Sequence, residues 1–243
     1  MEIDPQEYSF YYFATGWQKI NLFDSTTGTT HRRASVLNQV TEITKVRHAE
    51  FNFGSGNSAC FVDGANPAIV YDGTDWVTLT SSGSGVKSSA GGGQCLNLPA
   101  VVDVFKNHLF LSGDPTNASV VCHSKPEDPF NFVAANGAGQ LLPGFDLVDF
   151  KAFRDNLFFF GTNSIKKVIV DVTSGFVVEQ VTNNVGCIAR DSVLEIGGDL
   201  VFLAPDGIRP VAGTSRIGDV ELETISKPIQ QLLTQLPTTY DLE

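Results

Sequence analysis

The side chains best suited to catalysis or metal binding in this chain of 243 residues are four histidines and four cysteines. The sequence has neither a His-Glu-x-x-His zinc helix nor a Gly-x-Ser-x-Gly nucleophile turn. Cys122-His123 is the one adjacent Cys/His pair, and no second pair stands at ligand spacing. The cysteines form no Cys-x-x-Cys pair, so we expect isolated thiols and neither a zinc motif nor a disulfide framework. The eight residues are His31, His48, His108, His123, Cys60, Cys95, Cys122 and Cys187.

Two acidic turns, Asp63–Asn66 and Asp72–Asp75, superficially resemble calcium loops. They lack the glutamate at the twelfth position and the alternating ligands, so ordinary turn chemistry explains them better. Asp72–Trp76 also looks like the end of the Asp-box turn of sialidase-type propellers, where that turn is structural. A sialidase needs clustered arginines to grip the substrate carboxylate, whereas the seven arginines here are scattered. We therefore expect no catalytic, cofactor-binding or metal-binding residues.

A Gly/Ser-rich stretch at residues 81–94 is the single low-complexity segment. A phosphate-binding loop needs a strand before it, a helix after it and usually a Lys-Ser/Thr pair, but Gln94-Cys95 follows here. The composition predicts a flexible loop.

The overall charge argues against a broad DNA-binding face. The formal net charge is -11 and the pI is about 4.7, and phosphate contacts need clustered Lys and Arg. The two basic spots, His31–Arg33 and Lys166-Lys167, are interpreted as solvated strand or loop edges. We expect no signal peptide, because the opening Met1–Pro5 has no basic segment followed by an apolar stretch. No apolar run approaches the roughly 20 residues that span a bilayer. We expect a soluble product without a membrane anchor, made in a reducing cytoplasm.

The elements that position these residues form a repeat. Five short apolar runs each lead into a turn signal, and their turn markers are 48, 41, 49 and 44 residues apart. A period in the forties that contains strands and no helical pattern is typical of a β-propeller blade of four short strands. Runs of three or four apolar residues suit a strand that is covered on both faces. The runs are Lys19–Phe23, Ala68–Tyr71, His108–Leu111, Leu157–Phe160 and Leu200–Leu203, and the markers are Asp24, Asp72, Gly113, Thr162 and Asp206.

The fold class predicted from this repeat is all-β, a single β-propeller domain over residues 1–243 with about five four-stranded blades. The alternative is a β-sandwich, whose turns recur roughly every 8 to 12 residues and can imitate a longer period. The first fifty residues are strand-rich but less periodic, and Tyr8–Lys19 resembles the later strands of a blade. Closure of the propeller by both termini, or a sixth blade, stays open.

The last segment predicts a short C-terminal amphipathic helix over residues 225–237. Ser226 can begin the helix and Pro237 can end it. Between them, apolar residues recur at i, i+3, i+4 and i+7 on one face, which must pack on the β-domain or on a neighbouring subunit. These residues are Ile229, Leu232, Leu233 and Leu236.

Several motifs in the right order, between about residues 45 and 236, resemble the propeller region of the tail nozzle proteins of short-tailed bacteriophages, also called tail tubular protein B. Nozzle proteins are typically much longer, so this chain resembles a reduced relative, a fragment or a propeller module of another tail part. The family has no transferable functional motif, and no residue roles are carried over. The motifs are Phe61–Gly73, Ser124–Phe132, Phe153–Ile165, Val185–Val193, Gly198–Leu203, Asp206–Arg209 and Ile225–Ile229.

The resemblance implies a structural virion protein of the tail. It implies a homo-oligomeric ring, a hexamer in the family, that contacts tail adaptor and fibre proteins and surrounds the DNA ejection channel. An acidic chain is compatible with a DNA conduit, because attractive phosphate contacts would retard passage. The alternative from another class is a propeller module that binds host surface glycans through residues such as Trp17 and Trp76. A glycosidase is the third reading, and a propeller alone implies no chemistry.

Overall fold

The computed structural model describes residues 8–13, 16–21, 45–79, 96–173 and 175–211. These residues form an all-β protein made of antiparallel sheets, with one short 3₁₀ turn, η1 (Ala134–Asn136). The predicted loop at 81–94 and the predicted helix at 225–237 lie outside the described residues. No helix among the described residues has the length and apolar character needed to span a bilayer.

Four sheets follow one another along the chain, and each joins its strands in sequence order. The first sheet contains β3 (Arg47–Asn52), β4 (Asn57–Val62), β5 (Ile69–Tyr71) and β6 (Trp76–Thr78). The second contains β7 (Val101–Phe105), β8 (His108–Ser112), β9 (Val121–His123) and β10 (Gly139–Leu141). The third contains β11 (Asp149–Phe153), β12 (Asn156–Phe160), β13 (Ile165–Asp171) and β14 (Gly175–Thr182). The fourth contains β15 (Leu194–Ile196), β16 (Asp199–Ala204) and β17 (Gly207–Pro210). A separate two-stranded hairpin pairs β1 (Tyr8–Phe13) with β2 (Gly16–Asn21).

The predicted repeat of strands is present, but the marker Asp72 follows the third strand of the first sheet and not the second. β8, β12 and β16 are the second strands of their sheets, whereas Ala68–Tyr71 overlaps β5, the third strand of the first sheet. The second strand there is β4, whose turn begins at Asp63 and not at Asp72. The error arose because both turns carry an Asp-Gly signal. Measured between the ends of second strands, the spacing is 50 (62 to 112), 48 (112 to 160) and 44 (160 to 204) residues.

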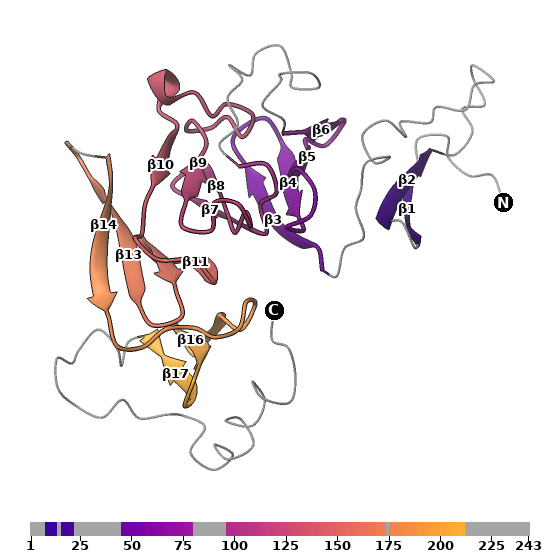
Figure 1. Ribbon diagram of the computed structural model, residues 1–243. Coiled ribbons are helices and arrows are strands. Elements are labelled where there is room, and N and C mark those ends of the chain that lie inside the picture. Colours follow the sequence, from indigo (N-terminus) through magenta and orange to yellow (C-terminus); the bar gives the residue numbers. More distant parts are fainter. Residues whose placement is uncertain (1–7, 14–15, 22–44, 80–95, 174, 212–243) are drawn as a thin grey trace, which may run out of the picture.

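The hydrophobic core consists of three clusters, and each joins two consecutive sheets. The first cluster includes Val70 of the first sheet and Leu109 of the second. The second includes Phe110 of the second sheet and Phe159 of the third, and the third includes Phe160 of the third sheet and Phe202 of the fourth. Consecutive sheets therefore share buried side chains, and Figure 1 shows them following one another around an arc.

Strand β12 shows how this packing arises from the sequence. Leu157 and Phe159 belong to the second cluster, while Phe158 and Phe160 belong to the third. Alternate residues of a strand point to opposite faces of its sheet, so four consecutive apolar residues fill the interfaces on both sides. The prediction that this run is covered on both faces is confirmed.

One glycine is required by a close approach between the third and fourth sheets. The amide of Cys187 donates to the carbonyl oxygen of Gly161 at 2.9 Å. A Cβ atom on Gly186 would lie 2.0 Å from that same oxygen. Only glycine allows the segment before the fourth sheet to approach the end of β12 so closely.

Candidate functional site

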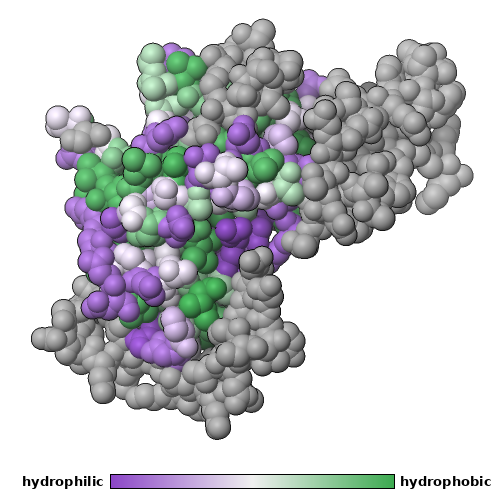
Figure 2. Space-filling view, viewed as in Figure 1, coloured by the Kyte–Doolittle hydropathy of each residue, from purple (hydrophilic) through white to green (hydrophobic). Residues whose placement is uncertain are grey.

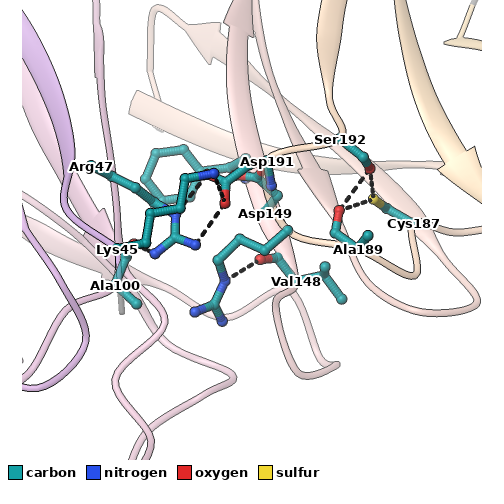
Figure 3. Close-up of polar contacts among 11 residues, drawn as sticks. Lys45, Arg47, Ala100, Val148, Asp149, Cys187, Ala189, Asp191 and Ser192 are labelled. Atoms are coloured by element: carbon teal, nitrogen blue, oxygen red, sulfur yellow. Dashed lines mark hydrogen bonds and ion pairs between the residues drawn. The ribbon is translucent and has the colours of Figure 1, made fainter. Parts of the chain in front are cut away.

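Charged side chains gather beside the first strands of the sheets, at the segments that precede or begin β3, β11 and β15. Figure 3 shows Lys45 and Arg47 directed toward Asp191, with Asp149 close by. Arg47 Nε and Nη2 donate to the two carboxylate oxygens of Asp191, each at 2.6 Å. Lys45 Nζ adds an ion pair at 2.8 Å. This set, Lys45, Arg47, Asp149 and Asp191, is called the central cluster.

The Arg47–Asp191 pair joins the two ends of the described series of sheets. Arg47 lies on β3 of the first sheet, and Asp191 precedes β15 of the fourth. Arg47 also donates to the carbonyl oxygen of Ala100, just before β7, at 3.3 Å. One guanidinium thus connects segments of the first, second and fourth sheets, and the planar fork of arginine suits such a bidentate contact.

Aspartates beside the first strands bind backbone amides of the next sheet. Asp103 Oδ2 on β7 accepts from the amide of Ala152 on β11 at 2.8 Å. Asp149 Oδ2 on β11 accepts from the amide of Asp191 at 3.0 Å. The first strand of each sheet is an edge strand, so its outward amides have no partner within the sheet. Where these amides are buried, they need another acceptor. These carboxylates supply them, so their local role is structural.

The two central aspartates titrate in opposite directions. Burial raises the pKa of Asp149 to about 6, against the opposing hydrogen bonds from the amides of Asp191 and Phe150. Burial would also raise the pKa of Asp191, but the hydrogen bonds from Arg47 and Lys45 outweigh it and hold that pKa below its ordinary value. Asp191 is therefore the anionic partner of the pair, while Asp149 is the group that takes up a proton around pH 6.

Cys187 lies near this region but is not activated. Its Sγ donates to the carbonyl oxygen of Ala189 at 3.0 Å and lies 3.1 Å from Ser192 Oγ. Burial is the main cause that raises the pKa of this thiol. The thiolate is the nucleophilic form of cysteine, so a thiol held protonated is a poor nucleophile.

A second cluster of titratable groups, the histidine pair, lies between the second and third sheets. His108 on β8 and His123 on β9 have ring centroids 5.1 Å apart, and Phe176 of β14 lies 4.9 Å from each. Both Nδ1 atoms face the carbonyl oxygen of Ser124, at 2.6 and 3.1 Å. Because a carbonyl only accepts, both Nδ1 atoms carry the hydrogen. A Cβ atom on Gly139 would lie 2.8 Å from His123 Nε2, so that glycine makes room for the ring.

Burial lowers the pKa of both histidines from the ordinary value of 6.5. The unfolded chain then binds more protons than the folded chain as pH falls below 6.5, so this pair makes the protein less stable on acidification. Asp149 acts in the opposite sense between its folded pKa of about 6 and its ordinary value of 3.8.

We expect the double variant His108→Gln, His123→Gln to lose less free energy of unfolding than the wild type between pH 7 and pH 5.5, because the groups that charge in the unfolded state are gone. Urea unfolding at the two pH values measures this. Asp149→Asn is the matched control, since it should steepen the loss of stability on acidification. An unchanged pH dependence in the histidine variant would contradict the assignment.

The acidic turns are turn elements, as predicted: Asp63 Oδ1 accepts from the amides of Ala65 and Asn66, and Asp72 Oδ1 from those of Thr74 and Asp75. Among the described residues, no three His, Cys, Asp or Glu side chains are grouped as metal ligands. His31–Arg33 and Cys95 lie outside the described residues.

Lys166 and Lys167 lie on the strand β13, but both are half-buried, so the predicted solvated edge is not what the structure shows. Lys166 Nζ donates to the carbonyl oxygen of Pro143 at 2.5 Å, and Lys167 pairs with Glu179 on β14 at 3.2 Å. Cys60 and Cys187 are free and buried, as predicted for isolated thiols. Cys122 is disulfide-bonded, so the prediction of four isolated thiols is wrong for this residue. The spacing of cysteines along the sequence did not indicate this disulfide, because its formation depends on which cysteines lie close together in the fold.

The four arginines in the described residues each have a protein partner. Arg154 donates to the carbonyl oxygen of Gly198 and Arg190 to that of Val148, at 2.5 and 2.9 Å. Arg209 pairs with Asp206, and Arg47 with Asp191.

Comparisons with known proteins add little. No family model matches the chain, and no curated protein gives a significant match. The chain is similar to the extracellular domain of a hybrid two-component system protein from B. thetaiotaomicron, at 13% identity and a TM-score of 0.49, covering 92% of this chain and 27% of that domain. It is also similar to the computationally designed protein Ika8, at 13% identity and a TM-score of 0.44, covering 84% of this chain and 54% of that one. Similarities this low support no inference about fold or function.

Proposed function

We propose that this chain is a β-propeller subunit of a short-tailed bacteriophage tail, which assembles as a homo-oligomeric ring around the DNA ejection channel. The observation that carries the proposal is the series of four sheets with equivalent strand order, 44 to 50 residues apart, in which each pair of consecutive sheets shares a core cluster. Propeller blades pack in this way. The β1–β2 hairpin would supply part of a fifth blade.

The central cluster favours a DNA channel that runs between the chains of the proposed ring and not through the centre of one chain. The Arg47–Asp191 pair bridges the first and fourth sheets at their first strands, where the axis of a propeller would be. Side chains that meet there leave the chain's own centre unsuited to conduct DNA. The channel of the proposed ring therefore runs between copies, and the adaptor and fibre proteins of the tail are its expected neighbours.

Exposed apolar side chains support assembly into an oligomer. Val170 and Val172 at the end of β13 are 51% and 102% exposed, and Leu142 after β10 is 67% exposed. Figure 2 shows hydrophobic residues gathered over the upper part of the β13–β14 hairpin. Exposed apolar patches on a protein commonly mark contact sites for other proteins.

A glycan-binding module is the second candidate, and the aromatic residues of the first sheet favour it. The Trp76 ring lies 4.8 Å from that of Tyr71 and 5.6 Å from that of Phe61, measured between centroids. Aromatic side chains supply much of the lining of ligand sites. The side chain of Trp17 lies outside the described residues.

Sedimentation of the purified chain, with a glycan-binding assay on the same sample, separates the two candidates. A ring subunit should sediment as a discrete oligomer and bind no host surface glycan. A monomer that binds glycans, and loses that binding in Trp76→Ala while retaining its sedimentation coefficient, would replace the ring with the module. Hydrolysis of the glycan by the wild type would point to a glycosidase instead.

A further inference from the structure

The first sheet has one aromatic face that is not part of the core. Rings from all four of its strands contact one another there: His48 on β3 lies 5.9 Å from Phe61 on β4, and Phe61 and Tyr71 on β5 both contact Trp76 on β6. These four residues are called the aromatic face. They form a continuous row of ring contacts across the sheet.

The strand register places this row opposite the core side. Cys60 and Val70, which are paired across β4 and β5, belong to the first core cluster. Phe61 and Tyr71 follow them by one residue and so lie on the other side of the sheet. Among the described residues, none of the three core clusters includes a member of the aromatic face. His48 is exposed, while Phe61 and Tyr71 are half-buried.

The order of packing in the rest of the chain indicates what covers this face. The first sheet packs on the second, the second on the third, and the third on the fourth, so every core cluster joins neighbours in the sequence. The element that precedes the first sheet is the β1–β2 hairpin. By the same order, its place is the side of the first sheet that faces away from the second.

The hairpin itself needs a partner. It pairs six residues of β1 with six of β2, and an isolated two-stranded hairpin is at best marginally stable in water. The register pairs position 12 with position 17, position 10 with position 19 and position 8 with position 21. Six of the twelve residues of the two strands are aromatic: Tyr8, Phe10, Tyr11, Tyr12, Phe13 and Trp17.

We infer that the β1–β2 hairpin of the same chain packs on the aromatic face of the first sheet and extends the series of stacked sheets by one. Aromatic pairs across the interface would bury large apolar surfaces from both sides. The segment between Asn21 and Arg47 is long enough to let the hairpin reach this face. The inference does not depend on the proposed virion role.

The two tryptophans of the chain allow a direct test. In the full-length variant Trp76→Phe, Trp17 is the sole tryptophan and reports on the hairpin. We expect its emission to be blue-shifted and protected from acrylamide. Adding Phe61→Lys, which places a charge on the aromatic face, should shift the emission to longer wavelength and raise quenching. Val172→Lys, at an exposed position of the third sheet, is the matched control and should change neither.

Hydrogen exchange on the same variants completes the test. The amides of β1 and β2 should lose protection in Phe61→Lys while those of β12 keep theirs, which shows that the rest of the fold is intact. If Phe61→Lys unfolds the chain, the variant His48→Glu, at an exposed position, replaces it. The amides of β1 and β2 should lose protection in that variant too. A water-exposed Trp17, hairpin protection that Phe61→Lys or His48→Glu leaves unchanged, or protection that disappears on dilution and so requires a second copy, would each overturn the inference.

Discussion

The variant Phe159→Ala should lose about 3 to 5 kcal/mol of unfolding free energy, the range for an aromatic side chain deleted from a packed core. Phe159 is fully buried on β12, and its ring packs against that of Phe150 at 6.2 Å. It belongs to the cluster that joins the second and third sheets. The cavity would therefore weaken an interface between sheets and not only one sheet.

Urea unfolding at pH 7 measures this loss. Val172→Ala is the control, because its side chain is fully exposed and its removal should change stability by less than about 0.5 kcal/mol. Hydrogen exchange should report weaker protection in both β8 and β12, since both contribute to the cluster. A loss below about 1 kcal/mol, or weakening confined to the third sheet, would contradict the stacked arrangement.

The variant Arg47→Met should lose about 2 to 3 kcal/mol, because it leaves the Asp191 carboxylate without its bidentate partner. The Arg47 side chain is 14% exposed and that of Asp191 is 28%, so we place the loss below that of a fully buried pair. Lys45→Met is the matched control. Lys45 contacts the same carboxylate but is 55% exposed, so its removal should cost less than about 1 kcal/mol.

The acid limb of the stability curve gives a second measurement on Arg47→Met. The pKa of Asp191 lies below its ordinary value of 3.8 in the folded protein. Its contribution is therefore present above that value and is lost as pH falls through the folded pKa. Arg47→Met should reduce the acid-induced loss of stability below pH 4, a window set by that ordinary value. Equal effects of Arg47→Met and Lys45→Met, or an unchanged acid limb, would contradict the bridging role.

Local patterns in the sequence predicted the strands well because the signals are local. The apolar run Leu157–Phe160 is a strand covered on both sides, and the Asp-Gly turns end strands where expected. The same reliance on local signals explains why Ala68–Tyr71 was assigned to the wrong strand of its sheet. Two successive Asp-Gly turns give the same signal, and only the pairing of β4 with both β3 and β5 distinguishes them.

The central cluster could not be predicted, because its members are distant in the sequence. Arg47 and Asp191 are 144 residues apart, and no motif contains both of them. Their contact depends on how four sheets are arranged, which no local pattern encodes. The histidine pair is similar: His108 and His123 lie in unrelated contexts in the sequence, and adjacent strands bring them together.

The most direct test of the proposed role is cryo-electron microscopy of the particles from which this protein is purified at its native source. The account predicts a symmetric ring of copies around the tail axis, with the DNA channel between the copies and each chain's own centre closed by side chains. Density at the periphery of the tail, or absence of the protein from the particles, would contradict the account and favour the glycan-binding module.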